Sequence, residues 1–410
     1  MAKEYKDLIV GLDIGTAKVM AVVAEVLPGG ELRLAGLGVA SSHGLKRGVV
    51  VNIDATVASI QQALKEAEMM AACKIDHVYT GITGSHIRGQ NSTGMVIVRD
   101  NREVTPVDVH RVVETAKAIN IPNDQRLLLV EPQEFVIDGH EVKEPVGMSG
   151  SRLEVKVHIV TGAQSAAENI LKCVRRCGLE VVRLVLNPSA SAASVLTEDE
   201  KMLGVALVDI GAGTTDVSIF TEGSIRHTAV IPIAGDLITS DIAMALRTPT
   251  KDAEEIKVEY GVAKQLLADP GDTLEVPGLG DRAPRMLSRQ ALAGVIEPRV
   301  EEIYSLVHQV IRESGYEELL SSGIVITGGS SVMPGMVELG EDIFLKPVRK
   351  GLPTYSGPLF DMVANPRSAT VMGLLEEARV ARARGQKVAQ QAGSVQTLFG
   401  RAKDWFLGNF

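Results

Sequence analysis

The 410-residue sequence contains few aromatic residues and few cysteines. Phe, Trp and Tyr together make up 3% of the chain, so its cores must be built mainly from Val, Leu, Ile, Ala and Met. The three cysteines, Cys73, Cys173 and Cys177, do not form a disulfide framework, and the sequence places no other Cys or His pair to complete a zinc site. We therefore interpret them as buried free thiols in a reducing cytoplasm.

The sequence also shows no membrane span, no secretory signal and no excess of basic residues. No stretch reaches about 18 uninterrupted apolar residues, and the charged start MAKEYKD contains no apolar segment. A net charge of −9 argues against nucleic acid as a partner. With 45% hydrophobic and 23% charged residues over 410 positions, the chain is expected to form a soluble protein of two or more domains.

The most informative stretch is Leu207–Phe220, LVDIGAGTTDVSIF, in which two apolar runs flank a turn rich in Gly and Thr. This pattern predicts a β-hairpin. Its tip also suits a polyphosphate: Gly lets the backbone approach closely, N–H and hydroxyl groups donate to phosphate oxygens, and a carboxylate at the strand end can hold Mg²⁺ through water. Taken alone, the stretch fits a plain turn equally well.

Two further stretches remove this ambiguity. Leu8–Val23, LIVGLDIGTAKVMAVV, repeats the order of strand, Asp-x-Gly turn and strand about two hundred residues earlier. Such a repeat predicts an internally duplicated fold whose halves face each other across a nucleotide. Ile324–Met336, IVITGGSSVMPGM, is a β-branched strand ending in a Gly turn before a helix, where the backbone can pass close to a base or ribose.

The three motifs resemble those of the actin, sugar-kinase and heat-shock-chaperone ATPase superfamily. Its phosphate-1, phosphate-2 and adenosine motifs match Asp13–Thr16, Asp209–Thr215 and Thr327–Gly329, and its two connecting helices match Asn187–Ala192 and Asn365–Gly373. Within the superfamily the sequence most resembles the FtsA family of bacterial actin-like division proteins, over essentially all 410 residues. The resemblance implies an α/β, actin-like ATPase fold with two duplicated domains flanking a nucleotide cleft.

We expect this cleft to bind ATP and Mg²⁺. Asp13 and Asp209 would hold the metal through water, and Asp209 and Asn187 are possible positioning groups for water or metal. The residues expected to surround the phosphates are Gly15, Thr16, Ala17, Lys18, Gly211, Ala212, Gly213, Thr214 and Thr215. The residues expected to enclose adenosine are Glu254, Lys257, Gly328 and Gly329, and the further residues expected to bind the cofactor are Gly235, Ser330 and Met333. For Glu254 and Lys257, spaced i, i+3, a solvated helical ion pair is the alternative.

The residues near the expected phosphates predict slow or absent turnover. Superfamily members that hydrolyse ATP well usually place Glu or Gln near the first connecting helix, where it positions the attacking water. This sequence has Asn187 there, a shorter and uncharged side chain, and Ala17 replaces the second hydroxyl residue often found in phosphate-1. Nucleotide would then act more as an assembly ligand than as a fuel.

The expected elements divide the chain into two main domains and several smaller parts. The first domain would comprise residues 1–82, 164–203 and 361–375, and the second 204–235 and 301–360, with 236–300 as its smaller subdomain. Residues 83–163 would form an inserted α+β subdomain, which by resemblance contacts other divisome proteins or neighbouring protomers. Residues 376–394 are expected to be a flexible or partly helical linker.

Local patterns predict several boundaries. Thr105 should cap a helix that has Pro106 in its first turn. Other predictions are a polar connecting segment at Thr197–Lys201, separate strands at Arg126–Val130 and Glu134–Ile137, one helix over Thr250–Leu267 with a polar cap, a loop at Asp269–Pro284 and a long helix over Arg289–Ser314.

The tail 395–410, VQTLFGRAKDWFLGNF, has the periodicity of an amphipathic helix. Its apolar face would contain Val395, Leu398, Phe399, Ala402, Trp405 and Phe406. From Glu376 onward six Lys/Arg and three Asp/Glu give +3, against −12 for the rest of the chain. A basic aromatic helix on an acidic protein predicts a membrane-surface anchor, with docking on the protein's own body as the alternative. Ordering one tail offsets most of its burial energy, so several tails on one polymer would be needed for firm attachment.

The leading interpretation is therefore an FtsA-like protein of bacterial cell division. It would assemble into filaments with ATP, attach peripherally to the cytoplasmic face of the inner membrane at the septum, and tether the tubulin-like FtsZ ring there while recruiting later divisome proteins. By resemblance, FtsZ would bind at residues 236–300. The alternatives are a chaperone-type actin-fold ATPase and a pilus-assembly adaptor that docks a partner peptide.

Overall fold

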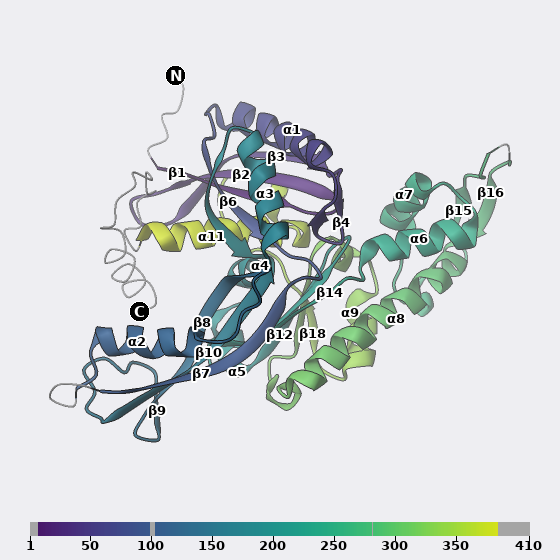
Figure 1. The fold of residues 1–410 in the computed structure, drawn as a ribbon. Coiled ribbons are helices and arrows are strands. Elements are labelled where there is room, and N and C mark those ends of the chain that lie inside the picture. Colours follow the sequence, from purple (N-terminus) through teal and green to yellow (C-terminus); the bar gives the residue numbers. More distant parts are fainter. Residues whose placement is uncertain (1–6, 99–102, 281, 384–410) are drawn as a thin grey trace.

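The computed structural model describes residues 7–98, 103–280 and 282–383, which are organised around two five-stranded sheets of the same topology (Figure 1). In each sheet the three strands that come first in the chain form an antiparallel meander. Two further strands then add in parallel beside the first strand of that meander. Written from the antiparallel end, the first sheet has the order β3-β2-β1-β6-β11 and the second the order β14-β13-β12-β17-β18. The equal strand order confirms the predicted duplication.

The strands of the first sheet are β1 (Leu8–Ile14), β2 (Lys18–Val26), β3 (Leu32–Ser41), β6 (His77–Ile82) and β11 (Glu180–Leu186). Those of the second are β12 (Val205–Ile210), β13 (Thr215–Thr221), β14 (Ser224–Ile231), β17 (Ile324–Thr327) and β18 (Val348–Lys350). A short hairpin, β4 (Leu45–Lys46) and β5 (Val49–Val50), follows β3. The central strands are buried on both faces because helices cover both sides of each sheet.

Helices α1 (Ile53–Ala71) and α3 (Gln164–Arg176) cover one face of the first sheet. The Asn52 side chain accepts a hydrogen bond from Ala55 N and so caps α1. Helix α1 lies directly on β3, where a Cβ atom added to Gly38 would stand 2.0 Å from the carbonyl oxygen of Ala63. This close approach requires glycine in β3.

Two connecting helices, α4 (Asn187–Val195) and α11 (Ala369–Ala383), join the domains and cross in direct contact. A Cβ atom added to Gly373 would lie 1.7 Å from the carbonyl oxygen of Ala190. Helix α11 packs on the other face of the first sheet and continues through residue 383, so the linker expected from residue 376 was predicted to begin too early. Ala378 and Ala381 are buried, which the composition of this stretch did not indicate. Residues 384–394 and the amphipathic helix predicted over 395–410 lie outside the described residues.

The second domain adds α6 (Gly235–Leu246), α7 (Thr250–Tyr260), α8 (Arg289–Ser314) and α9 (Met336–Phe344). The prediction for α8 is confirmed, whereas the single helix over Thr250–Leu267 is wrong: α7 ends at Tyr260 and a separate turn η1 (Gln265–Leu267) follows. The chain leaves the helix because Ala263 N donates to Pro334 O at 2.8 Å. The residue preceding α7 is Pro249, which makes no side-chain cap, so the polar cap is also wrong.

Two polar connecting stretches contain regular structure that the sequence did not predict. The loop expected at Asp269–Pro284 contains β15 (Thr273–Val276), which pairs with β16 (Arg285–Ser288) and buries Leu274 and Val276. The segment Thr197–Lys201 starts the short helix α5 (Glu198–Leu203), with a capping box between Thr197 and Glu200.

The inserted subdomain is a four-stranded sheet of order β7-β10-β8-β9 with one helix on one face. Its elements are β7 (Arg88–Ile97), α2 (Pro106–Lys117), β8 (Gln125–Ile137), β9 (His140–Val142) and β10 (Arg152–Ala163). The Thr105 cap is confirmed. The two strands expected within β8 are one strand, because a bulge at Gln133 accommodates Pro132, which has no N–H for the ladder.

The inserted subdomain also contacts the second domain, through the outer strand β14. The bulged Gln133 donates from Nε2 to Ile225 O at 2.8 Å, and Asn91 donates from Nδ2 to Arg226 O at 3.1 Å. Between them His158 is buried, with Nδ1 2.6 Å from Asn91 Oδ1 and Nε2 2.9 Å from Thr228 Oγ1. In Figure 1 this subdomain and the α7–β16 region lie at opposite ends of the molecule. No helix within the described ranges is long and apolar enough to cross a bilayer.

Acidification is expected to weaken the joint at His158. Burial, with a smaller effect of nearby His227, lowers the pKa of His158 from 6.5 to about 4. Between pH 6.5 and 4 this histidine therefore binds a proton in the unfolded chain but not in the folded chain. The free energy of unfolding falls as the pH drops through this range, by at most about 1.4 kcal/mol per pH unit. Urea unfolding at several pH values should show a shallower slope for His158→Gln than for wild type. His110→Gln, on a side chain that is 44% exposed, serves as the control, and an unchanged slope in His158→Gln would contradict this assignment.

Candidate functional site

The three predicted glycine-rich corners meet in one cleft between the two sheets. Its volume is 580 Å³, within the range of about 300–1,000 Å³ that is typical of ligand pockets. The predicted residues that line it are Asp13, Gly15, Thr16, Ala17, Lys18, Asn187, Asp209, Gly211, Ala212, Gly213, Thr214, Glu254, Lys257, Gly328, Gly329, Ser330 and Met333.

Two predicted residues, Thr215 and Gly235, do not line the cleft. The hydroxyl of Thr215 points away and donates to Ile233 O at 2.8 Å, so it is not available to a phosphate. Gly235 lies behind the cleft, where a Cβ atom would stand 2.4 Å from Ser330 Oγ. Glycine at this position allows the start of α6 to approach the turn after β12. In that turn the Gly211 carbonyl accepts hydrogen bonds from Gly235 N and from Ser330 Oγ.

The two hairpin turns have the same backbone geometry and touch each other. Gly15 N donates to Lys18 O and Gly211 N to Thr214 O, each at 2.9 Å. A Cβ atom on Gly213 would lie 2.6 Å from Thr16 Oγ1, so only glycine fits where the tips meet. The β4–β5 hairpin closes the same end, with Gly48 N donating to Thr16 Oγ1 at 3.1 Å. The amides and hydroxyls of both turns can therefore donate to one anionic ligand.

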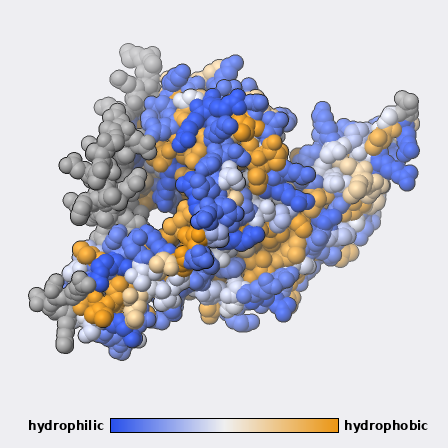
Figure 2. All heavy atoms as spheres, in the orientation of Figure 1, coloured by the Kyte–Doolittle hydropathy of each residue, from blue (hydrophilic) through white to orange (hydrophobic). Residues whose placement is uncertain are grey.

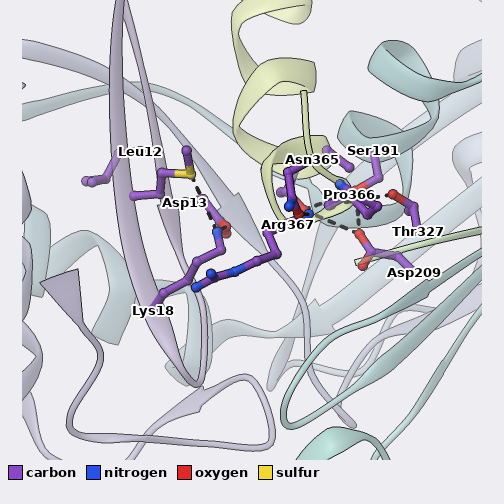
Figure 3. A network of polar contacts seen from close by, with 12 residues as sticks. Leu12, Asp13, Lys18, Ser191, Asp209, Thr327, Asn365, Pro366 and Arg367 are labelled. Carbon is purple, nitrogen blue, oxygen red and sulfur yellow. Dashed lines mark hydrogen bonds and ion pairs between the residues drawn. The ribbon is translucent and has the colours of Figure 1, made fainter. Parts of the chain in front are cut away.

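The carboxylates of the two hairpins have different partners. Asp13 forms an ion pair with Lys18 at 2.9 Å. Asp209 accepts a hydrogen bond from Ser191 Oγ of α4 at 2.6 Å and a longer one, 3.4 Å, from Thr370 Oγ1 of α11 (Figure 3). Burial raises the pKa of Asp209 despite these hydroxyl groups. Both connecting helices are thus attached to one carboxylate at the floor of the cleft.

A third carboxylate, Asp216, was missed in the sequence. It lies directly across the hairpin from Asp209 in the strand register, lines the cleft and accepts a hydrogen bond from Thr83 Oγ1 at 2.8 Å. Burial and the neighbouring Asp209 raise its pKa to about 8. The hairpin register itself was the signal that would have identified it, because opposite residues project to the same face.

The donor set fits a magnesium ion held through water. Among the described residues no three His, Cys, Asp or Glu side chains are close enough to ligate a metal together. Mg²⁺ keeps several of its waters and needs only one or two carboxylates, which Asp13 and Asp209 supply. In addition, Asn187 lines the cleft; its buried Oδ1 has no hydrogen-bond partner and faces Gly81, where a Cβ atom would lie 2.1 Å from it.

The adenosine corner is formed by the turn after β17 and by α7. Gly328 has a φ of +87°, and a Cβ atom there would lie 2.3 Å from Asp209 Oδ1, so glycine is required for this turn to approach β12. Lys257 pairs with Glu254 at 2.6 Å and donates to Thr239 Oγ1 at 2.8 Å. Glu254 and Lys257 therefore form the helical ion pair and also line the cleft.

The second connecting segment supplies further residues that the sequence did not single out. Pro366 and Arg367 of the turn η4 (Pro366–Ser368), together with its capping residue Asn365 and with Thr370 of α11, line the cleft. The segment itself was recognised, but the directions of its side chains depend on how α11 crosses α4.

Comparisons with known proteins agree with this architecture. Two family models match, Cell division protein FtsA over residues 206–373 and SHS2 domain inserted in FTSA over residues 84–161. The cell division protein FtsA of Pseudomonas aeruginosa is 56% identical over 410 residues, covering 98% of this chain and 98% of the relative. That of Escherichia coli is 43% identical over 415 residues, covering 99% of each.

Solved structures show the same fold at much lower identity. A PilM-PilN type IV pilus biogenesis complex chain matches with a TM-score of 0.65 and 18% identity, covering 90% of this chain and 98% of the other. MreB5 of Spiroplasma citri bound to ADP matches with a TM-score of 0.53 and 14% identity, covering 93% and 98%. These likenesses confirm the predicted actin-like α/β fold.

Proposed function

This chain belongs to the FtsA family of cell division proteins, and from that premise we propose that it binds MgATP, assembles into filaments and tethers the FtsZ ring to the cytoplasmic membrane. The observation that carries the nucleotide part is the convergence of both hairpin turns and the turn after β17 on one cleft. A structural neighbour, the MreB5 protein, holds ADP, which supports an adenine nucleotide as the ligand.

Within this cleft the residues have separate tasks. Asp13 and Asp209 hold Mg²⁺ through water, the two turns donate to the phosphates, and Lys257, Glu254 and Met333 border the adenosine. When bound, Mg²⁺ would neutralise phosphate charge beside Asp13 and Asp209. The attachment of Asp209 to Ser191 and Thr370 links the occupied site to both connecting helices, which supports a ligand that sets the angle between the domains.

Turnover is expected to be slow. Asn187, which lines the cleft, is our candidate for positioning water, and its side chain is shorter than Glu or Gln and cannot act as a base. We expect phosphate release far below the ~1–100 s⁻¹ of efficient phosphoryl-transfer enzymes, with a rise in Asn187→Glu. A steady-state phosphate assay measures both, and fast wild-type turnover would favour the chaperone-type alternative.

Partner contacts are proposed for the two ends of the molecule. The inserted subdomain exposes Met95, Ile97, Val107 and Met148, and Figure 2 shows apolar residues at its surface. Exposed apolar side chains gathered at one end of a molecule are typical of a protein-binding surface, and we assign this end to other divisome proteins or neighbouring protomers. The smaller subdomain exposes Leu266, Leu267, Leu279 and Met286, which supports residues 236–300 as the FtsZ-binding region.

Removal of residues 395–410 tests the membrane part of this proposal. With ATP and anionic liposomes, the full chain should sediment with the lipid and the truncated chain should stay in the supernatant, because the apolar face and basic charge of the tail are lost together. Trp405→Ser with Phe406→Ser, which keeps the charge, should also reduce sedimentation strongly. Undiminished sedimentation of the truncated chain would contradict a tail anchor and favour the docked-helix or pilus-adaptor alternatives.

A further inference from the structure

The cationic side chains of the cleft are not equally neutralised. Four of them line it: Lys18, Lys257, Arg289 and Arg367. Lys18 is paired with Asp13 at 2.9 Å, Lys257 with Glu254 at 2.6 Å, and Arg289 with Asp272 at 3.4 Å. Among the described residues no carboxylate and no other acceptor contacts the Arg367 guanidinium, whereas the backbone N–H of Arg367 donates to Asn365 Oδ1 at 3.0 Å.

The position of Arg367 in the chain is unfavourable for a cation that has no partner. Arg367 lies in η4, immediately before the N-terminus of α11. The helix dipole places partial positive charge at that end, so it disfavours a cation and favours an anion there. An anion bound beside Arg367 would reverse this repulsion.

Arg367 also lies between the adenosine corner and the phosphate corner. Its Cγ is 3.6 Å from the place of a Cβ atom on Gly329, so its aliphatic stem starts beside the turn after β17. In Figure 3 the side chain extends from there toward the Asp13–Lys18 pair. A ligand that joins the two corners must pass the guanidinium.

The phosphate end of the cleft needs this positive charge. The two carboxylates proposed to hold the metal, Asp13 and Asp209, line the cleft there, and Lys18 is already engaged by Asp13. A polyphosphate beside them is repelled unless additional cations compensate it. An unpaired guanidinium, which binds phosphate oxygens with charge-assisted and often bidentate hydrogen bonds, meets this need.

We propose that Arg367 is a nucleotide-binding residue that contacts the α- and β-phosphates. It would therefore increase the affinity for ATP and the affinity for ADP by a similar factor. The inference rests on the proposed function of the same cleft and adds a phosphate contact from the second connecting segment. Any nucleotide with at least two phosphates, ATP or ADP, would then contact the segment that leads into α11.

Titration calorimetry of the full chain with ATP and with ADP, each with Mg²⁺, tests the proposal. Arg367→Gln should weaken both nucleotides by a similar factor of about 10 to 100, Arg367→Lys should lie between this variant and wild type, and the loss should shrink at high salt. Arg379→Gln, the same change on the outer part of α11 where Arg379 pairs with Glu376, should bind like wild type. Thermal unfolding of each variant without nucleotide establishes that it is folded.

Two results would overturn the inference. Affinities of Arg367→Gln within twofold of wild type would place the guanidinium outside the site, and a loss for ATP without a loss for ADP would place it at the terminal phosphate. Failure of the wild-type chain to bind either nucleotide would instead overturn the proposed function. Binding that depends on Asp209 but not on Arg367 would overturn the inference alone.

Discussion

Gly373→Ala is expected to destabilise the protein by about 4 kcal/mol or more, a large part of the roughly 5–15 kcal/mol that stabilises a folded domain. The added methyl group would lie 1.7 Å from the carbonyl oxygen of Ala190, and the contact is with backbone, which cannot rotate away. Helices α4 and α11 must therefore separate. Thermal or urea unfolding of the purified variant measures the loss.

The surrounding geometry adds a second consequence. Ser191 and Thr370, which both bond to Asp209, lie within one helical turn of the crossing point. A fraction of Gly373→Ala that still folds should therefore bind nucleotide poorly, because the floor of the cleft is displaced. Gly340→Ala is the matched control, since this buried helical glycine leaves 3.4 Å to its nearest neighbour, Val348. Its stability should be equal to or slightly above that of wild type, and equal loss in both variants would contradict the role of the crossing.

Combined replacement of Asp13 and Asp209 by alanine is expected to weaken MgATP binding by at least about 100-fold, given that loss of one outer-shell metal partner costs about 10- to 100-fold. The protein should nevertheless stay folded. Burial raises the pKa of Asp209, so its replacement removes a carboxyl that is costly to bury, and Ser191 and Thr370 keep their mutual contact at 3.0 Å. Calorimetric titration with ATP in the presence of Mg²⁺ measures the effect.

Chelation separates the metal contribution from the phosphate contribution. In EDTA the ATP affinity of the wild type should fall close to that of the double variant. The reason is that the carboxylates bind the phosphates through Mg²⁺ and repel them without it. Asp209→Asn keeps a hydrogen-bond acceptor for Ser191 while removing the charge, so it should resemble Asp209→Ala in affinity. Unchanged MgATP affinity in the double variant would exclude these two carboxylates as metal partners and with them the proposed site.

The apolar and glycine patterns of the sequence determined the repeated part of this protein. Strand, Asp-x-Gly turn and strand occur twice because each half must bury a sheet and leave a donor-rich turn at its end, and both features are local in sequence. The long helix α8 and the Thr105 cap were likewise predictable from spacing and capping residues. So was the family, since the motifs that carry it lie in short continuous stretches.

Tertiary structure decided which of these residues work together. Alternation along β13 and the packing of α6 turned the Thr215 hydroxyl away from the cleft, while hairpin register brought Asp216 opposite Asp209. Helix α7 ends early because its continuation bonds to Pro334, seventy or so residues later in the chain.

The partners of Asp209 and the direction of Arg367 depend on a helix crossing between segments about 180 residues apart. No local pattern encodes that distance, because the crossing is fixed by the two sheets that each helix packs against. The sequence by itself thus determined the donors of the candidate site, and the tertiary structure determined which charges face each other within it.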